Sequence, residues 1–423
     1  MNSESRPQLR YAELDWDAQG QPRSRRFEDV YFSRAGGLAE ARHTFLDGNG
    51  LAQRFAALTP GAQFVVAETG FGTGLNLLAC CALWQRTAPP SARLRFISIE
   101  QYPLHASDLQ RALALWPELA PWSDRLAANY PDCLQPGFHQ LVLSERVELT
   151  LIIAEVASGL AALMPSTHPC HRWPNRPVDA WFLDGFSPAR NESMWSEEVL
   201  ASVRQLSAPG TTVATFSAAG AVRRGLQAQG FDVTKMPGFG RKRDMLGARL
   251  TQPPPRPLPS AYPASPYRSA HGLAWPVQRP PSARPRKIAV IGAGLAGTQL
   301  AHALAKRGCQ LTVYEASGEA GGGASGNRQG LIYGRLSAHR SPQADFNMTA
   351  LNHAARYYRD WLSASEASRL GARSGLLQLA TGASAVQEQQ QLHAQWPGQT
   401  LFQSVSAPEA SELAGVPLAH GGL

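Results

Sequence analysis

Five apolar runs recur along the first half of the chain, separated by longer stretches of mixed polarity. They are QFVVAE (63–68), LRFISIE (94–100), VELTLII (147–153), VDAWFLD (178–184) and TTVATFS (211–217). Several show little polar alternation, which is typical of strands in a parallel sheet covered on both faces. Intervening segments such as LNLLACCALWQR and AAGAVRRGLQAQG have the character of crossover helices. The pattern predicts a doubly wound α/β domain, whose ligands bind beyond the carboxyl ends of the strands.

A proline-rich segment then interrupts this pattern. Residues 251–286 contain eleven prolines and no acidic residue. Proline lacks the backbone N–H and fixes its own φ, so this composition excludes a helix or a central strand and favours a semi-rigid linker. The 423-residue length also favours two domains. We therefore predict one domain over residues 1–250, a linker over 251–286 and a second domain over 287–423.

The second domain opens with a strand, a glycine loop and a helix. After the strand KIAVI comes Gly292-x-Gly294-x-x-Gly297, and the next apolar run ends at Glu315. In a dinucleotide-binding unit the glycines allow the turn, the approach of the pyrophosphate and helix packing, while the acid binds the adenosine ribose. This fingerprint predicts a bound dinucleotide, and it leaves open whether the cofactor is a flavin or a nicotinamide.

The first domain has a glycine loop with a different spacing. Strand VVAE ends at Glu68, and Gly70-x-Gly72-x-Gly74 leads into a helix that begins near Leu75. Glycine lets the loop turn sharply and lets a ligand touch the backbone. The helix start offers unpaired N–H groups that suit a carboxylate or a phosphate. An ordinary tight turn is the alternative interpretation.

Acidic residues follow the next two strands of this domain. Glu100 ends the second strand, where a carboxylate can hold two ribose hydroxyls, and the combination with the glycine loop resembles the S-adenosylmethionine site of class I methyltransferases. Glu155 follows the LTLII strand and could accept a hydrogen bond from the adenine amino group, or could simply be an acid at a helix N-terminus. Asn76, just after the loop, completes the predicted cofactor contacts.

A carboxylate also ends the apolar run VDAWFLD. Asp184 stands in the turn Asp184-Gly-Phe186-Ser-Pro188, which resembles the Asp/Asn-Pro-Pro-aromatic motif of amino-group methyltransferases. In that chemistry a carboxylate aims a neutral amine at the sulfonium methyl and accepts a proton as the product forms. Phe186 would stack on a base and Pro188 would shape the turn. An ordinary turn or N-cap aspartate is the simpler alternative.

The net charge of +8 is concentrated in one stretch. Residues 1–203 carry 17 basic and 22 acidic residues, whereas residues 204–249 carry 8 and 2. Such a distribution fits either an anionic partner or a solvated basic surface. The candidates for nucleic-acid phosphate contacts are Arg223, Arg224, Arg241, Lys242 and Arg243. Tyr31 and Phe32 could stack on an unpaired base or could be buried.

Several classes of protein are disfavoured by composition. The start MNSESRPQLR lacks the apolar core of a signal peptide, and no apolar stretch approaches a membrane span. Five irregularly spaced cysteines do not make a disulfide framework, so we predict a cytoplasmic protein. His168, Cys170 and His171 are too crowded for a tetrahedral zinc site, and we predict no metal.

Together these stretches resemble the bifunctional MnmC enzymes of bacterial tRNA modification. The similarity is carried by FEDVYFS, ETGFGTGLN, FISIEQYPL, WPELAPW, DAWFLDGFSPARNESMW, VRRGLQAQGF, GFGRKRDML and GASGNRQG. The loop GGGASGNRQGLIYGRLS (321–337) further resembles the flavin-approaching loop of amine oxidases. It therefore favours FAD, with contacts from Gly322, Ser325 and Asn327.

The resemblance implies two reactions on the wobble uridine of tRNA. The FAD half would remove a carboxymethyl group from 5-carboxymethylaminomethyluridine, and the methyltransferase half would methylate the freed amine to 5-methylaminomethyl-2-thiouridine. Glu155 departs from the family, where aspartate is usual. Family members also continue well beyond 137 residues after the linker, so we expect a truncated oxidoreductase half. The alternatives are an amino methyltransferase acting on adenine in DNA and a non-catalytic RNA-binding protein.

Overall fold

The computed structural model describes most of the chain outside the proline-rich segment. The described residues are 9–32, 36–131, 134–164, 176–240, 242–252, 287–306, 308–327, 329–338, 341–362, 371–372, 374–395 and 402–423. Residues 253–286 of the predicted linker lie outside this set, as do His168, Cys170 and His171. Within the described part, no helix is both long enough and apolar enough to cross a membrane.

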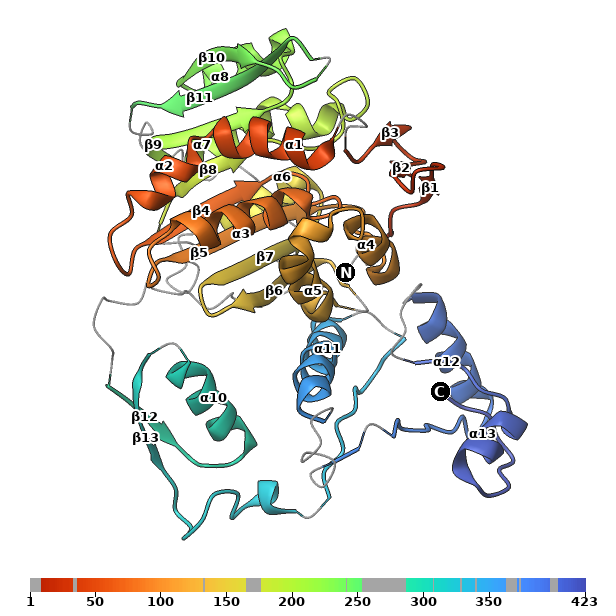
Figure 1. Ribbon diagram of the computed structural model, residues 1–423. Coiled ribbons are helices and arrows are strands. Elements are labelled where there is room, and N and C mark those ends of the chain that lie inside the picture. The colour runs from red at the N-terminus through yellow and green to blue at the C-terminus, as the bar shows by residue number, and fades with distance from the viewer. Residues whose placement is uncertain are drawn as a thin grey trace, which may run out of the picture.

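An eight-stranded sheet forms the centre of the first domain, with the order β10-β11-β9-β8-β4-β5-β7-β6 (Figure 1). The five strands β9, β8, β4, β5 and β7 run parallel, while β11, β10 and β6 are antiparallel to their neighbours. The strands are β4 (Gln63–Glu68), β5 (Arg93–Glu100), β6 (Gly137–Ser144), β7 (Val147–Ile153), β8 (Val178–Phe182), β9 (Ser207–Thr215), β10 (Phe231–Pro237) and β11 (Asp244–Leu250). The predicted doubly wound α/β fold is confirmed.

Helices cover both faces of this sheet. Packed around one face are α1 (Gly37–Ala41), the π-helical turn at Arg42–Asp47, α2 (Leu51–Ala56), α3 (Leu75–Thr87), α4 (Ala106–Leu113), a 3-10 turn at Pro117–Leu119 and α5 (Ala120–Asn129). Over the other face lie α6 (Val156–Leu163), a 3-10 turn at Glu192–Trp195, α7 (Glu197–Gln205) and α8 (Gly220–Ala228). A small antiparallel sheet, β1 (Leu14–Trp16), β2 (Pro22–Ser24) and β3 (Asp29–Val30), precedes them.

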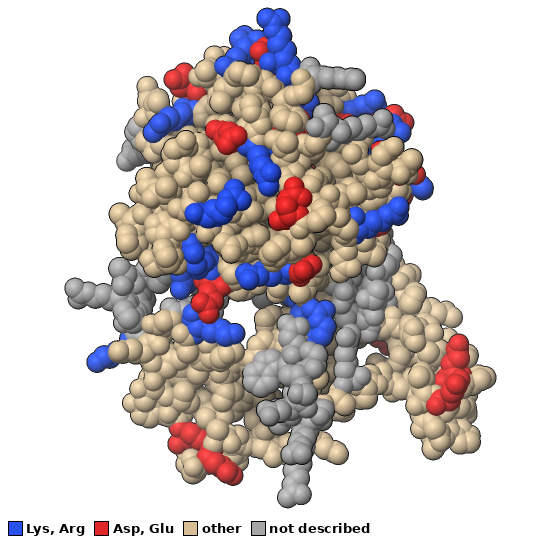
Figure 2. All heavy atoms as spheres, viewed as in Figure 1, with Lys and Arg blue, Asp and Glu red and all other residues tan. Residues whose placement is uncertain are grey.

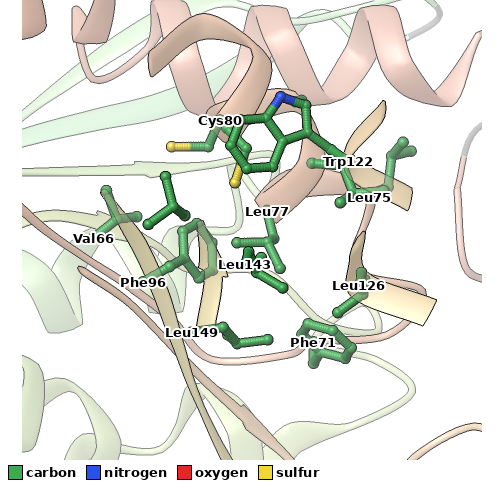
Figure 3. Close-up of a cluster of buried hydrophobic side chains, with 14 of the residues drawn as sticks. Val66, Phe71, Leu75, Leu77, Cys80, Phe96, Trp122, Leu126, Leu143 and Leu149 are labelled. Carbon is green, nitrogen blue, oxygen red and sulfur yellow. The ribbon is translucent and has the colours of Figure 1, made fainter. Parts of the chain in front are cut away.

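Alternate residues of the central strands supply two separate cores. Phe64 and Val66 of β4 join the cluster around α3 and α5, whereas Val65 and Ala67 join the cluster around α6 and α7. Figure 3 shows the first cluster, with Val66 and Phe96 of the sheet facing Leu77 and Cys80 of α3. Because both faces are apolar, these strands read as continuous hydrophobic runs rather than as alternating ones.

The chain beyond the linker forms a separate set of elements. Parallel strands β12 (Lys287–Ile291) and β13 (Gln310–Tyr314) pair beside α10 (Leu295–Ala305) and are followed by a 3-10 turn at Ala324–Gly326. Three helices follow, α11 (Pro342–Leu362), α12 (Ala383–Gln395) and α13 (Ala407–Ala414). In Figure 1, α11 lies next to α5, and the Arg359 guanidinium donates a hydrogen bond to the Ala128 carbonyl at the end of α5.

Candidate active site

A cavity of about 480 Å³ opens where β4, β5, β7 and β8 end. Its lining combines the loop after β4 with residues that follow the neighbouring strands and with aromatic side chains from the N-terminal segment. These lining residues include Phe27, Tyr31, Glu40, Thr69, Gly70, Gly72, Asn76, Glu100, Tyr102, Glu155, Asp184, Phe186, Phe216 and Lys242. A mixed polar and aromatic cavity at the carboxyl edge of a parallel sheet is the expected place for a small-molecule site in this fold.

The glycine loop after β4 forms one wall of the cavity. Gly72 (φ +53°) and Gly74 (φ +76°) adopt left-handed backbone conformations, and Gly74 is the N-cap residue of α3. A Cβ on Gly70 would lie 3.1 Å from the Asp184 carbonyl oxygen. The loop therefore needs glycine for two reasons, backbone conformation and close packing on the turn at residue 184. Gly70 and Gly72 line the cavity, while Gly74 begins the helix beside it.

Glu100 holds this loop from the end of β5. Its carboxylate accepts hydrogen bonds from the Gly72 N–H (2.9 Å) and from the Tyr102 N–H (2.8 Å). Burial raises the pKa of Glu100, and the backbone donors act against that shift. The side chain lines the cavity, so its position agrees with the predicted ribose-binding role.

Glu155 caps a helix and also lines the cavity. Its side chain accepts a hydrogen bond from the Ser158 N–H (3.0 Å) and so caps α6. The residue also lines the cavity. The helix-cap alternative therefore describes its present contact, and a bond to adenine stays a prediction that would have to share the carboxylate with the cap.

Asp184 lies two residues beyond β8 and faces the cavity. Its carboxylate accepts hydrogen bonds from the Gly185 N–H (2.8 Å) and from the Asn76 side-chain amide (2.5 Å), and its carbonyl accepts one from the Thr69 hydroxyl. Burial raises the pKa of Asp184 to about 6, although these donors and the nearby Lys242 ammonium favour the ionised form. Such a carboxylate can accept hydrogen bonds and can take up a proton near neutral pH.

Glu68 does not lie where the sequence places it. The side chain is 1% exposed and is not part of the cavity lining. Its two carboxylate oxygens are engaged behind the cavity, where Oε1 accepts from the Asn76 amide (2.8 Å) and Oε2 accepts from the Ser98 hydroxyl (2.7 Å). Asn76 itself lines the cavity. The prediction of a direct cofactor contact is therefore corrected for Glu68 and keeps its geometric basis for Asn76.

Three aromatic rings, those of Phe27, Tyr31 and Phe186, line the cavity together with Asp184. Phe186 stacks on Phe27 with ring centroids 4.5 Å apart and meets the edge of Tyr31 at 5.4 Å. All three rings line the cavity. Tyr31 also packs over Gly72, as the packing alternative expected, and its stacking on an unpaired base stays a prediction. Pro188 begins a turn just outside the cavity lining, and its role in shaping the loop stays a prediction.

Lys242 lines the cavity, and its side chain is 46% exposed. Its ammonium is 2.8 Å from the Glu40 carboxylate and 4.2 Å from the centre of the Phe216 ring. Both Lys242 and Glu40 line the cavity and act electrostatically on Asp184. The charge of Lys242 is thus paired with Glu40 beside Asp184, and its contact with a phosphate stays a prediction.

Three of the other predicted phosphate-binding residues are exposed, and the fourth lies outside the described residues. Arg223 and Arg224 are exposed on the first turns of α8, and Arg243 is exposed before β11. Figure 2 shows lysine and arginine side chains gathered at the top of the molecule, over the region of α8 and β10. Arg241 lies outside the described residues.

The second glycine loop has the geometry of a nucleotide-binding turn. Gly292 has φ +93°, and a Cβ on Gly297 would collide with the Gly292 carbonyl oxygen. The Glu315 carboxylate accepts from the N–H of Ala293 (2.6 Å) and from backbone N–H groups that follow it, which lower its pKa. The strand, loop and acid thus lie together as the fingerprint requires.

The loop over residues 321–337 approaches the N-terminus of α10. The Ser325 hydroxyl accepts a hydrogen bond from the Leu295 N–H (3.0 Å) at the N-terminus of α10, and lies 3.0 Å from where a Gly294 Cβ would be. Gly322 packs on Ser317, where a Cβ would not fit. Asn327 is exposed after the 3-10 turn. Ser325 thus lies at the start of α10, and its contact with the cofactor stays a prediction.

Some lining residues had no role in the sequence interpretation. Phe27 belongs to the FEDVYFS stretch, so the family resemblance contained a signal for it. Glu40 lies on α1, outside every stretch that the sequence analysis singled out. Phe216 directly follows the carboxyl end of β9, so its place at a strand end was a signal that the interpretation did not use.

Comparison with known proteins agrees with this arrangement. Residues 117–251 match the family model described as S-adenosyl-L-methionine-dependent methyltransferase, and residues 287–423 match the model described as FAD dependent oxidoreductase. Over 422 residues the chain is 44% identical to the tRNA 5-methylaminomethyl-2-thiouridine biosynthesis bifunctional protein MnmC of Pseudomonas paraeruginosa. The predicted resemblance to MnmC is confirmed.

A second MnmC relative, from Chromobacterium violaceum, is 42% identical over 421 residues. These alignments cover 98% of this chain but 59% and 58% of the MnmC relatives, so the chain spans somewhat over half of their length. Among solved structures, MNMC2 from Aquifex aeolicus aligns with a TM-score of 0.42 and 21% identity, over 60% of this chain and 74% of that one.

Proposed function

We propose that residues 1–250 form a methyltransferase domain that transfers a methyl group from S-adenosylmethionine to the aminomethyl nitrogen of a modified wobble uridine in tRNA. The observation that carries this proposal is the carboxylate of Asp184, which faces a cavity bordered by the glycine loop and by Phe186. The identity to MnmC proteins, which are named for this modified uridine, supplies the substrate class.

The cavity residues divide between cofactor and substrate in this proposal. S-adenosylmethionine, when bound, supplies an activated methyl group. Gly70, Gly72 and Glu100 would hold it, because they present backbone and carboxylate groups at the edge of the sheet. The uridine ring would lie against the aromatic group formed by Phe27, Tyr31 and Phe186.

Asp184 would act on the attacking amine. A primary amine attacks only as the neutral base, and a carboxylate that accepts its N–H hydrogens directs the lone pair toward the methyl carbon. As the C–N bond forms, the bond between the methyl carbon and sulfur would break and leave a neutral thioether. The positive charge passes to nitrogen, where the carboxylate stabilises it and then takes one proton. Its pKa of about 6 keeps Asp184 mostly ionised at neutral pH and still basic enough for that transfer.

For residues 287–423 we propose part of an FAD-dependent unit that removes the carboxymethyl group before methylation. Gly292, Gly294 and Gly297 with Glu315 would hold the adenosine and pyrophosphate, and Ser325 lies at the same helix start. FAD, when bound, accepts the electron pair of an amine oxidation. Residues 251–286 would link the two units, and a tRNA substrate places the protein in the cytoplasm.

The test is transfer of label from S-adenosylmethionine to tRNA. The purified chain is incubated with methyl-labelled S-adenosylmethionine and tRNA from a strain that lacks the terminal methylation, with unmodified tRNA and duplex DNA as parallel substrates. We expect label in 5-methylaminomethyl-2-thiouridine after nuclease digestion. Label in DNA adenine would replace the proposed substrate, and no transfer to any nucleic acid, with tRNA binding retained, would favour a non-catalytic RNA-binding protein.

A further inference from the structure

A chain of buried side chains runs from β5 through β4 and α3 to the turn at Asp184. Ser98 of β5 is fully buried, Glu68 of β4 is 1% exposed and Asn76 of α3 is 8% exposed. The Ser98 hydroxyl donates to Glu68 (2.7 Å), the Asn76 amide donates to Glu68 (2.8 Å), and the same amide donates to Asp184. Of these residues, Asn76 and Asp184 reach the cavity.

The two hydrogens of one amide nitrogen join two carboxylates in this chain. Nδ2 of Asn76 lies within hydrogen-bond distance of Oε1 of Glu68 and of Oδ2 of Asp184. An amide has two N–H donors on one side and a carbonyl acceptor on the other. If the Asn76 amide turned over, its carbonyl oxygen would face two carboxyl groups, so acceptance by Glu68 holds the second N–H on Asp184.

Glu68 can keep Asn76 oriented whether or not its own carboxyl group is protonated. Burial raises the pKa of Glu68 well above its usual range, and the negative charge of Asp184 adds to the shift. Protonation of Oε2 would leave Oε1 as a carbonyl acceptor for Asn76, with the proton directed to Ser98. The orientation of Asn76 is therefore maintained in both charge states of Glu68.

We propose that Glu68 is a positioning residue that fixes, through Asn76, the direction of the Asp184 carboxylate toward the acceptor amine. This role rests on the proposed methyl transfer and replaces the cofactor contact expected from the sequence. Removal of Glu68 should therefore slow the chemical step and leave the cofactor affinity nearly unchanged, because its carboxylate is absent from the cavity lining.

Three variants test this role by kinetics. Glu68→Ala removes the acceptor of the Asn76 amide. Glu68→Gln keeps an oxygen for Asn76 and an N–H for Ser98. Ser98→Ala removes the hydroxyl that donates to Glu68. For Glu68→Ala we expect kcat about tenfold or more below wild type, with the Kd for S-adenosylmethionine changed by less than about twofold. Glu68→Gln should recover most of the lost rate, and Ser98→Ala should lose less than Glu68→Ala.

A second readout does not need turnover. In amide NMR spectra, the Asn76 side-chain resonances should shift as pH passes through about 6, because Asp184 titrates there and shares this amide. The shift should persist in Glu68→Gln, disappear in an Asp184→Asn control and be lost in Glu68→Ala. If Glu68→Ala does not fold, Glu68→Leu removes the same acceptor with little change of volume and serves the same comparison.

Each opposing result rejects the role of Glu68. A Kd for S-adenosylmethionine that rises in parallel with the loss of rate would restore the cofactor contact. An Asn76 resonance that follows pH in Glu68→Ala as in wild type would show that Glu68 does not hold the amide. If the wild-type chain transfers no methyl group, the proposed function fails, and the NMR comparison still decides the role of Glu68.

Discussion

Asp184 joins two requirements of amine methylation in one side chain. The Gly185 N–H and the Asn76 amide fix its carboxylate in the wall of the cavity, and burial brings its pKa to about 6. The donors favour the ionised form, and burial favours the neutral form, so the group is poised between an acceptor of N–H bonds and an acceptor of a proton. Its protonation state should therefore be visible in the pH dependence of the reaction.

The first prediction concerns that dependence. In the wild-type chain, kcat/KM for methyl transfer should rise with pH through about 6, because the proposed role of Asp184 requires its ionised form. Asp184→Asn should lower kcat by on the order of 10²–10⁴-fold, since an amide cannot take the proton. Titration calorimetry should give an unchanged Kd for S-adenosylmethionine. Undiminished turnover in the variant would reject the role of Asp184.

The second prediction uses the ion pair beside Asp184. Lys242 lowers the pKa of Asp184 and Glu40 raises it, so their removal should move the acid limb of the kcat/KM profile in opposite directions. Lys242→Met should shift the limb to higher pH, and Glu40→Gln should shift it to lower pH. Lys235→Met is the matched control, because Lys235 pairs with Asp244 on the surface. Shifts of the same sign in both variants would contradict this electrostatic account.

At the residue scale, the sequence predicted the groups that stand at strand ends or in motifs. Asp184 and Glu100 could be found because a parallel sheet brings its carboxyl ends to one edge. The burial of Glu68 behind the cavity could not be predicted. It depends on hydrogen bonds from Asn76 and Ser98, which contact Glu68 only after α3 and β5 pack on β4.

At the element scale, the glycine loop couples the two sides of the cavity. Gly72 packs under the Tyr31 ring and donates its N–H to Glu100, while Gly70 touches the backbone at residue 184. Any displacement of this loop should therefore disturb the cofactor side and the aromatic side together.

A third prediction separates this coupling from ordinary backbone strain. Gly72→Ala places a Cβ 3.2 Å from the Tyr31 ring at φ +53°, whereas Gly61→Ala places one in open space at φ +79°. Each should lower the free energy of unfolding by about 1–2 kcal/mol, the cost of a left-handed alanine. Only Gly72→Ala should also weaken binding of S-adenosylmethionine in calorimetry. Equal cofactor affinity in both variants would show that the loop does not hold the cofactor.

The apolar runs predicted the five parallel strands to within a few residues. They run continuously hydrophobic because both of their faces are covered. Strands β6, β10 and β11 were not predicted. The alternating polar positions of β6 and β10, as in FHQLVLS and FDVTKMP, lack that continuous pattern, and the short apolar positions of DMLGARL in β11 are interrupted by Gly247 and Arg249.

At the scale of the whole molecule, two exposed arginines lie on the same edge of the sheet as the cavity. Arg223 and Arg224 are exposed at the start of α8, which follows the carboxyl end of β9, on the edge of the sheet that carries the cavity. A tRNA whose target base entered the cavity could place phosphates on this surface.

The fourth prediction tests that surface by its salt dependence. Arg223→Ala combined with Arg224→Ala should weaken tRNA binding and reduce the slope of log K against log salt by roughly one to two. Arg86→Ala is the control, because Arg86 is exposed at the far end of α3, about 15 Å along the helix from Asn76 in the cavity. Fluorescence anisotropy at several salt concentrations measures both. A slope that stays the same in the double variant would exclude these contacts.

The fifth prediction concerns the flavin half. Gly297 packs α10 against the turn at Gly292, and a Cβ there would collide with the Gly292 carbonyl oxygen, so Gly297→Ala should open the turn that is proposed to hold the pyrophosphate. Gly318→Ala is the control, since its Cβ would meet open space without a left-handed φ. We expect flavin absorbance bands in the purified wild type and in Gly318→Ala, and their loss in Gly297→Ala, while methyl transfer persists in all three. The two activities would then reside in separate units of the chain. Flavin retained in Gly297→Ala would mean that FAD binds away from this turn.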